Sequence, residues 1–369
     1  MNILYLSHLS GNLYAGPTHS VPRQIFYQSQ IDNVFWYNLV KKDIPKWKKL
    51  PYYHDLSDYA CEKIENLPSP FNKPDLIIVE SFYNMVLSKL ILKLTYGDIP
   101  YVIVPRGELT LKAQKRKLLK KTIANLLICK RYAKKALGIQ YLTEQEKEDS
   151  GLKWNKNSII IPNGIEEPEQ VKTVFNKQKM KCVFIGRIEP YQKGLDILID
   201  SCIQLKDKLK MRNCEISIYG PDVDNKLPEL RNKVNKLQLD SIIKFYGPVY
   251  EDEKREVLLE HDIFLMPSRF EGHPMALIEA LSYGLPVVVS RGSNMKEEIE
   301  LNNAGWTSEN NMESFTFALN KMLDEVNLFE VKGKNAIELA NKYKWKNIAI
   351  ISHEKYMDLL MKNSFNKGV

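Results

Sequence analysis

Short apolar runs with the length and composition of buried strands alternate with helix-like runs along the whole chain. This alternation predicts an α/β protein whose parallel sheets are covered by helices on both faces. Sheets of this kind bind ligands beyond the carboxyl ends of their strands, so polar residues at those ends are the first candidates for function. The predicted strands are Ile3–Leu6, Val34–Leu39, Leu76–Val79, Tyr101–Val104, Gly138–Leu142 and Ile159–Ile161 in the first half, and Cys182–Ile185, Glu215–Tyr219, Ile242–Tyr246, Ile263–Met266 and Val287–Val289 in the second.

The length of 369 residues suggests two domains of ordinary size. A turn signal, Pro162-Asn163-Gly164, follows the last strand of the first half. A polar segment without hydrophobic periodicity then leads to a new strand at Cys182. The sequence therefore predicts domains of residues 1–165 and 181–340, with an amphipathic helix at 345–360 that packs back onto the first domain.

The net charge of +8 favours anionic partners such as phosphates, nucleic acid or an acidic membrane surface. The five cysteines are scattered and form no Cys-x-x-Cys pair, so neither a disulfide framework nor a zinc site is predicted, and a reducing compartment fits best. No apolar run approaches the roughly 20 residues that span a bilayer. The first residues read as a strand rather than a signal peptide, so we expect a cytoplasmic protein.

The stretch from Arg269 to Leu281 contains two glutamates eight positions apart. Glu271 is expected in a strand-to-helix loop, and Glu279 about two turns into a helix that Pro274 opens. The start of such a helix presents free N–H groups and a positive dipole end to an anion. Carboxylates on either side could bind hydroxyl groups, as in a nucleotide sugar. An ordinary α/β element without a ligand would have the same pattern.

Other glycine and basic residues also follow predicted strands. Arg187 and Lys193 lie in the loop after Cys182–Ile185, where they could bind phosphate or simply lie at the surface. Gly16 lies in a loop after the first strand that lacks the G-x-G-x-x-G pattern, so a nicotinamide or flavin fingerprint is absent; this loop could also be a plain surface turn. Arg106 directly follows the strand Tyr101–Val104.

Two patterns argue against a metal site. The pair Asp222 and Asp224 lies among turn residues, which favours a solvated turn over a divalent metal under a diphosphate. The six histidines show no metal-ligand spacing, and His273 is the one of most interest because it lies inside the Glu271 loop.

The segment from Leu111 to Ala136 has ten basic residues, no acidic residue and an apolar face. It resembles an interfacial helix attracted to anionic lipid. The alternative is a core helix with a solvated basic face. Nucleic-acid binding is not expected, because no aromatic interleaving or known module accompanies the charge.

Several motifs together resemble the retaining GT-B glycosyltransferases of family four, the group-one glycosyl transferases, over nearly the whole chain. The Pro105-Arg106-Gly107 segment with its lysine-rich continuation resembles the branch that builds bacterial surface polysaccharides. The other motifs are Gly186-Arg187, Lys193-Gly194, the Glu271–Glu279 spacing, Ile161-Pro162-Asn163-Gly164-Ile165, Phe245-Tyr246-Gly247-Pro248-Val249 and Gly284-Leu285-Pro286-Val287-Val288.

The resemblance implies a fold of two Rossmann-like domains facing a central cleft, and a metal-independent reaction that retains anomeric configuration. It implies that Glu271 contacts hydroxyls of the donor sugar and that Glu279 binds the ribose. The further implied donor-binding residues are Arg187 and Lys193 at the diphosphate, the backbone around His273, Pro274 and Met275 at sugar and phosphate, Val249 beside the base, and Gly16, which lets the first domain close onto the diphosphate.

The chain departs from the family pattern at two places. Family members often have a histidine after the strand that here ends at Val104, whereas this chain has Arg106, which we predict as a catalytic residue together with Glu271. The key loop usually reads Glu-Gly-Phe-Pro, and His273 here replaces the aromatic residue.

The expected function is transfer of a sugar from a UDP-sugar or GDP-sugar to a lipid-linked or growing glycan, without a cofactor or metal, in the cytoplasm and at the inner membrane face. The alternatives are a nucleotide-sugar epimerase or hydrolase on the same scaffold, and a non-catalytic partner subunit of a true transferase.

Overall fold

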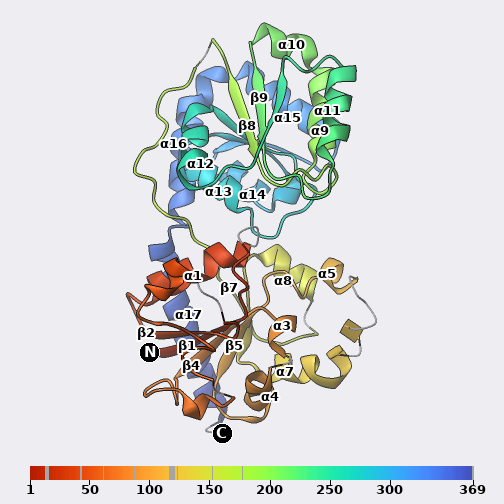
Figure 1. The fold of residues 1–369 in the computed structure, drawn as a ribbon. Coiled ribbons are helices and arrows are strands. Elements are labelled where there is room, and N and C mark those ends of the chain that lie inside the picture. The colour runs from red at the N-terminus through yellow and green to blue at the C-terminus, as the bar shows by residue number, and fades with distance from the viewer. Residues whose placement is uncertain are drawn as a thin grey trace. The chain divides into compact units, whose positions relative to one another are not determined.

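The structure is a computed structural model that describes residues 1–12, 16–41, 44–60, 62–86, 88–115, 121–122, 124–151, 153–176 and 178–367. The chain divides into two compact units. The first unit contains residues 1–164 and 345–369, and the second contains residues 165–344. Each unit is built on one parallel sheet, with helices on both of its faces (Figure 1).

The first unit has a seven-stranded sheet in the order β3-β2-β1-β4-β5-β6-β7. Every adjacent pair of strands is parallel. Parallel strands are covered on both faces, which explains why the central ones are continuous apolar runs. The strands are β1 (Asn2–Ser7), β2 (Asn33–Asn38), β3 (Tyr53–Asp55), β4 (Leu76–Glu80), β5 (Tyr101–Val104), β6 (Gly138–Tyr141) and β7 (Ser158–Ile160).

Alternate residues of β1 enter the two apolar layers of the first unit, as the two-residue period of a strand requires. Ile3 and Tyr5 lie in the layer that contains apolar residues of α1 and α17. Leu4 and Leu6 lie in the layer of α4 and α7. The helical elements are α1 (Gly16–Gln28), α2 (Pro45–Lys48), η1 (Ile64–Asn66), α3 (Tyr83–Val86), α4 (Lys89–Tyr96), α5 (Leu111–Lys115), η2 (Asn125–Cys129), α7 (Lys130–Lys135), α8 (Glu144–Ser150) and α17 (Trp345–Lys367).

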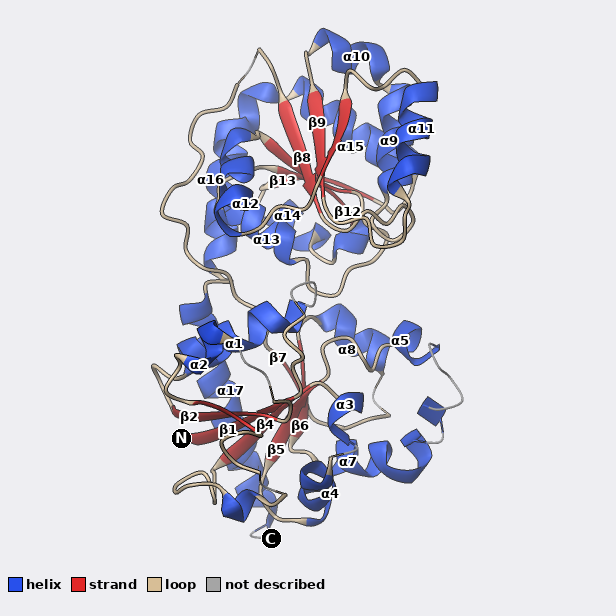
Figure 2. Ribbon diagram, in the orientation of Figure 1, coloured by secondary structure: helices blue, strands red, loops and turns tan. Residues whose placement is uncertain are grey.

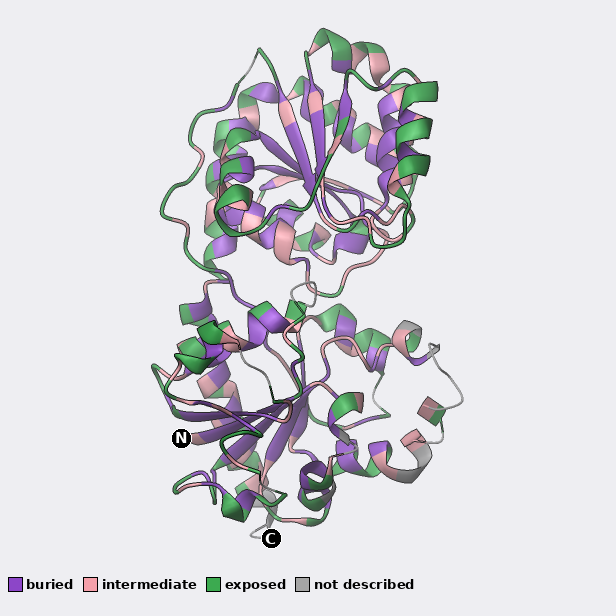
Figure 3. Ribbon diagram, in the orientation of Figure 1, coloured by how far each residue is buried: buried purple, intermediate pink, exposed green. Residues whose placement is uncertain are grey.

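The second unit has a six-stranded parallel sheet in the order β10-β9-β8-β11-β12-β13. Figure 2 shows the sheet between its two helix layers, and Figure 3 shows that most of its strand residues are buried. The strands are β8 (Lys181–Ile185), β9 (Glu215–Tyr219), β10 (Ile243–Tyr246), β11 (Ile263–Met266), β12 (Val287–Ser290) and β13 (Gly305–Ser308).

The two faces of β8 pack against different helices. Cys182 and Phe184 lie in a core with apolar residues of α9, α11 and α15. Val183 and Ile185 lie in a core with residues of α12, α13, α14 and α16. The helical elements are α9 (Leu195–Gln204), α10 (Lys206–Met211), α11 (Leu227–Lys236), α12 (Glu251–Glu260), α13 (Met275–Ser282), η3 (Arg291–Ser293), α14 (Lys296–Leu301), α15 (Met312–Asp324), η4 (Val326–Leu328) and α16 (Phe329–Asn341).

All eleven predicted strands coincide with observed strands to within about two residues at each end, the boundary precision expected of sequence reasoning. The sequence prediction did not include β3 or β13, which are the outer strands of their sheets. Of the predicted basic helix from Leu111 to Ala136, residues 116–120 and 123 lie outside the described residues, and the described parts form α5, η2 and α7. Within the described ranges, none of the helices is both long and apolar enough to cross a membrane.

Candidate functional site

The strand order of the second unit reverses between β8 and β11. From β8 the chain continues outward to β9 and β10, and from β11 it continues in the other direction to β12 and β13. The loops that leave the carboxyl ends of two such strands diverge, and the crevice between them is where open α/β sheets bind ligands. Arg187 and Lys193 lie in the loop after β8, and Glu271 and His273 lie in the loop after β11.

The two loops meet through an ion pair between Lys193 and Glu271. Lys193 Nζ lies 2.8 Å from Glu271 Oε1 and 2.9 Å from Oε2. Ser268 Oγ donates a further hydrogen bond of 2.6 Å to Oε1. The side chains of Lys193 and Glu271 are only 13% and 8% exposed. The carboxylate is therefore held in one orientation beside a single cation, in a setting where water screens the charges weakly.

Glycines allow this close approach. Gly194 has a φ of +66°, and a Cβ there would lie 1.9 Å from the carbonyl oxygen of Pro267 in the second loop. A side chain at Gly194 would force these two loops apart, so the distance between Lys193 and Glu271 depends on a residue that lacks one. A Cβ at Gly220, after β9, would lie 1.7 Å from the carbonyl oxygen of Gly186, so the segments after β8 and β9 also approach closely.

Arg187 is linked to the second loop through Gln192, a residue that the sequence analysis did not single out. Arg187 Nη2 donates to Gln192 Oε1 at 3.3 Å, and Gln192 Nε2 donates to the carbonyl oxygen of Phe270 at 3.4 Å. The structure thus brings Arg187, Lys193 and Glu271 together around the two loops. Their roles toward a donor stay predictions.

Arg269 and Asp196 were also not singled out. They form a bidentate ion pair with N–O distances of 2.7 and 2.8 Å. The sequence does contain a signal for this pair, because Arg269 is a cation in one loop and Asp196 is an acid in the first turn of the helix that follows the other loop. Only the fold shows that the two loops are neighbours.

Glu279 lies closer to the start of its helix than the sequence suggested. Because α13 begins at Met275, Glu279 is just over one turn into the helix, not two. Its carboxylate pairs with Lys254 of α12. The side chains of Glu279 and Lys254 are 27% and 22% exposed, so this carboxylate is more accessible than that of Glu271.

The loop around His273 is held from several sides. Asn294 Nδ2 donates to the carbonyl oxygens of Glu271, at 2.6 Å, and of Gly272, at 3.3 Å. The ring of His273 lies 5.8 Å from the ring of Tyr343. The Met275 N–H donates to the carbonyl oxygen of His273 at 3.0 Å, so a ligand that used this N–H would compete with the loop itself.

Pro274, Val249 and Gly16 differ in their surroundings. Pro274 is buried and occupies the cap position of α13. Val249 is also buried, in the core of the second unit, so its side chain is already packed by protein. Gly16 begins α1 of the first unit, and a Cβ at this position would meet no atom within 4 Å. The predicted contacts of these three residues with a donor are not tested by the geometry.

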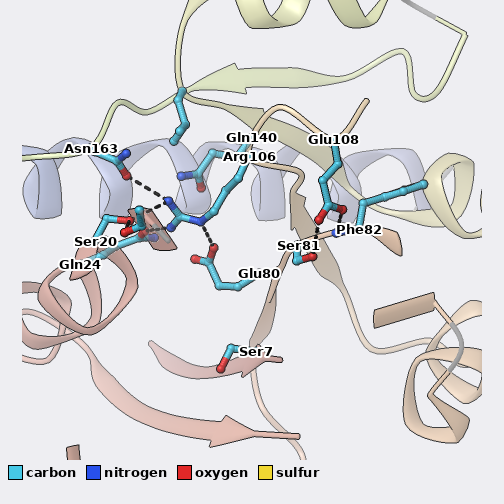
Figure 4. Close-up of polar contacts among 12 residues, drawn as sticks. Ser7, Ser20, Gln24, Glu80, Ser81, Phe82, Arg106, Glu108, Gln140 and Asn163 are labelled. Atoms are coloured by element: carbon cyan, nitrogen blue, oxygen red, sulfur yellow. Dashed lines mark hydrogen bonds and ion pairs between the residues drawn. The ribbon is translucent and has the colours of Figure 1, made fainter. Parts of the chain in front are cut away.

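Arg106 lies in a buried polar network of the first unit (Figure 4). Its guanidinium donates to Glu80 at 2.7 Å, Gln24 at 2.9 Å, Asn163 at 3.0 Å and Ser20 at 3.2 Å. The side chains of Arg106 and Glu80 are 6% and 1% exposed. This network gives Arg106 a structural role that the sequence did not indicate. Its predicted role as a catalytic residue stays a prediction.

Of Asp222 and Asp224, the pair considered as a metal site in the sequence, Asp222 caps a helix. Asp222 accepts hydrogen bonds from the backbone N–H groups of Lys226, at 2.7 Å, and Leu227, at 3.1 Å, at the start of α11. The preference for a solvated turn over a metal site at this pair stays a prediction. Among the residues that the structure describes, there is no group of three or more His, Cys, Asp or Glu side chains placed to hold a metal ion.

Residues 179–325 match the model of the protein family described as "Glycosyl transferases group 1". This range contains both loops and the residues Arg187, Lys193, Glu271 and Glu279. The segment belongs to the group 1 glycosyl transferase family. The family predicted from the motifs is therefore confirmed at this level.

Individual proteins resemble the group 1 segment or the whole chain. The amylovoran biosynthesis glycosyltransferase AmsK of Erwinia amylovora is 34% identical over 135 residues, which are 35% of this chain and 32% of that relative's length. Among solved structures, sucrose-phosphate synthase from Thermosynechococcus elongatus has a TM-score of 0.71 at 14% identity, covering 98% of this chain and 100% of that one. HepE of Anabaena, in complex with UDP, has a TM-score of 0.69 at 15% identity, covering 97% and 100%.

At these identities the likeness to solved structures concerns the fold. The predicted fold class, α/β of the GT-B type, is confirmed.

Proposed function

We propose that this protein is a glycosyltransferase that moves a sugar from a nucleotide-sugar donor to a lipid-linked or growing glycan in surface polysaccharide biosynthesis. The observation that carries the proposal is the ion pair of Lys193 and Glu271 at the strand-order reversal of the second unit. The family match of this segment and the amylovoran biosynthesis relative support it. The structural likeness to HepE with bound UDP supports a nucleotide donor.

The chemistry needs both signs of charge at one place. As the glycosidic bond of the donor breaks, the leaving diphosphate gains negative charge and the sugar carbon gains positive charge. Lys193 and Arg187 would stabilise the diphosphate, and groups already aimed at developing charge lower a barrier most. Glu271 would bind the hydroxyls of the donor sugar beside the reacting carbon. Glu279 would bind the ribose.

We also propose that the reaction needs no metal ion or cofactor and retains anomeric configuration. The support is that the side chains of Lys193 and Arg187 supply positive charge for the diphosphate from the chain itself. The donor is a UDP-sugar or a GDP-sugar. The cytoplasm, where such donors are made, is the compartment that this proposal requires.

The two alternatives make different demands on the same loops. An epimerase or hydrolase would use the donor without a glycan acceptor. A non-catalytic partner subunit would not need the Lys193–Glu271 pair. The Lys193–Glu271 pair lies at the strand-order reversal of the sheet, where open α/β sheets bind ligands, and this position favours an active site over the partner subunit.

The test is a panel of UDP-sugars and GDP-sugars, with free UDP and GDP as references. A donor that binds the folded protein raises its melting temperature by mass action, and about 2.7 kcal/mol of stabilisation is expected at 100 times the dissociation constant. The stabilising donor should then support sugar transfer to an extract of lipid-linked glycans. Hydrolysis at the same rate without acceptor would favour the hydrolase, and stabilisation by no nucleotide would contradict the proposal.

We propose a second partner, the anionic surface of a membrane. Helix α7 presents Lys130, Arg131, Lys134 and Lys135, all exposed. The guanidinium of Arg131 lies 4.3 Å from the ring centre of Tyr96, which is 69% exposed. Basic side chains beside an exposed aromatic ring suit the headgroup region of a bilayer.

Replacement of Lys130, Arg131 and Lys134 by glutamine is expected to weaken binding to vesicles that contain anionic lipid. At about 1 kcal/mol for each basic residue, the loss would be about 100-fold at low salt. Cosedimentation with phosphatidylglycerol vesicles measures it. The matched control replaces Lys226, which caps α11, and Lys233 and Lys236 within α11 by glutamine. Equal binding by the α7 variant and the wild type would remove the membrane as a partner of α7.

A further inference from the structure

Arg269 lies two residues before Glu271, yet its charge is directed away from that glutamate. Its guanidinium forms the bidentate pair with Asp196 in the first turn of α9 and donates to the carbonyl oxygen of Tyr191 at 2.8 Å. It also lies 4.5 Å from the ring centre of Tyr191. The hydrogen bonds that Arg269 donates to Asp196 raise the pKa of Arg269 above its ordinary value. Arg269 is thus committed to the loop after β8.

The backbone completes this connection. Arg269 N–H donates to the carbonyl oxygen of Gln192 at 2.8 Å. The side chain of Gln192 accepts from Arg187 and donates to the carbonyl oxygen of Phe270. One loop is therefore tied to the other by both the backbone and the side chain of Gln192. We refer to Tyr191, Gln192, Asp196 and Arg269 as the clasp.

We propose that Arg269 and Gln192 are positioning residues for the reaction. Arg269 would hold the two loops at the separation that lets Lys193 meet Glu271, and Gln192 would aim the guanidinium of Arg187 at the diphosphate. The proposal rests on the proposed function, because that function gives the positioned groups their roles toward a donor. The connection between the two loops does not depend on a donor. Neither residue needs to touch the substrate.

The chemistry of the two side chains supports this division of work. Only a planar guanidinium can donate to both oxygens of Asp196 and to a carbonyl while stacking on Tyr191, so lysine cannot replace Arg269. A glutamine side chain can accept with one end and donate with the other, which the link from Arg187 to Phe270 requires. Displacement of a reacting group by about 1 Å can lower a rate about 100-fold, so a clasp of this kind affects catalysis without contact.

The first experiment tests Gln192 through Arg187. The dissociation constants of UDP and GDP are measured by calorimetry for Gln192→Met, Arg187→Met and the double variant. If Gln192 acts through Arg187, Gln192→Met is expected to weaken binding by about 3- to 10-fold in the wild-type background and by less than about 2-fold beside Arg187→Met. Equal losses in both backgrounds would overturn the role of Gln192.

The second experiment needs no nucleotide and tests Arg269. Hydrogen exchange of the ligand-free protein is compared for Arg269→Lys and the wild type. Exchange in both segments 187–194 and 267–274 is expected to become at least about 10-fold faster, because local opening then breaks fewer contacts. Lys233→Gln, which removes the surface pair with Asp200, is the control. Unchanged exchange in either segment would overturn the clasp.

The two experiments separate the clasp from the proposed function. If the wild type binds neither UDP nor GDP, the proposed function fails, and the exchange rates still decide whether Arg269 joins the loops. If nucleotide binds and Arg269→Lys also lowers kcat with little change in donor KM, positioning is supported over a role in general stability.

Discussion

Replacement of Glu271 by glutamine is expected to lower the turnover number for sugar transfer by about 100- to 1000-fold. Removal of one group that faces developing charge typically costs about 3–4 kcal/mol, and each 1.36 kcal/mol is about tenfold in rate. The amide keeps the shape of the carboxylate and can still accept from Ser268 and Lys193. The loss would therefore come from the missing charge rather than from a disturbed loop. Initial rates with the donor identified by the panel measure the effect.

The matched control for this substitution is Glu215→Gln. Glu215 also pairs with lysines, at 3.5 and 3.7 Å, but it begins β9 and so lies at the amino end of the sheet. It should retain nearly full activity. Undiminished transfer by Glu271→Gln would show that the carboxylate has no part in the chemistry, and the catalytic assignment would be wrong.

Replacement of Arg106 by methionine is expected to destabilise the first unit by about 3–5 kcal/mol, the usual cost of leaving one charge of a buried pair without its partner. Glu80 would keep its charge at 1% exposure and lose its cation. For a unit of this size the melting temperature should fall by about 6–20 °C. The double variant Arg106→Met, Glu80→Leu should recover much of the loss, because the buried charge is then absent.

The same pair of variants decides between two roles for Arg106. If Arg106→Met leaves the melting temperature unchanged but abolishes transfer, Arg106 contacts the substrate as the sequence predicted. If the double variant regains both stability and activity, the buried network is the reason for Arg106.

The sequence predicted the strands well because most of them are buried on both faces and therefore are apolar runs. The two strands that it missed are at the edges of their sheets. In β13, burial alternates along Gly305-Trp306-Thr307-Ser308, and only Trp306 and Ser308 are buried. This strand therefore does not form a continuous apolar run. β3 has three residues and includes His54 and Asp55, which no apolar pattern would indicate.

The site could be predicted only in part, for a physical reason. Lys193 and Glu271 stand out because they lie in the loops that leave the carboxyl ends of apolar strands, where open α/β sheets bind ligands. Gln192, Asp196 and Arg269 act through hydrogen bonds between loops that are more than 70 residues apart in the chain. Which residues become hydrogen-bond partners depends on how the backbone turns within each loop. The hydrophobic periodicity of the sequence carries no information about these turns.

Glu279 and Arg106 illustrate the same limit. The helix after the key loop begins at Met275, only four residues before Glu279, so Glu279 lies just over one turn from its start rather than the predicted two. The position of Arg106 at a strand end was evident in the sequence. Its burial was not, because its four partners come from α1, β4 and the segment before Gly164.

The most direct test of the central claim is a crystal structure with UDP or GDP bound, whichever the protein binds more tightly. We expect the diphosphate oxygens within about 3 Å of Lys193 Nζ and of the Arg187 guanidinium, the distance of a charge-assisted hydrogen bond, with the ribose hydroxyls at Glu279. A nucleotide bound elsewhere, or bound with its diphosphate in contact with neither cation, would contradict the account.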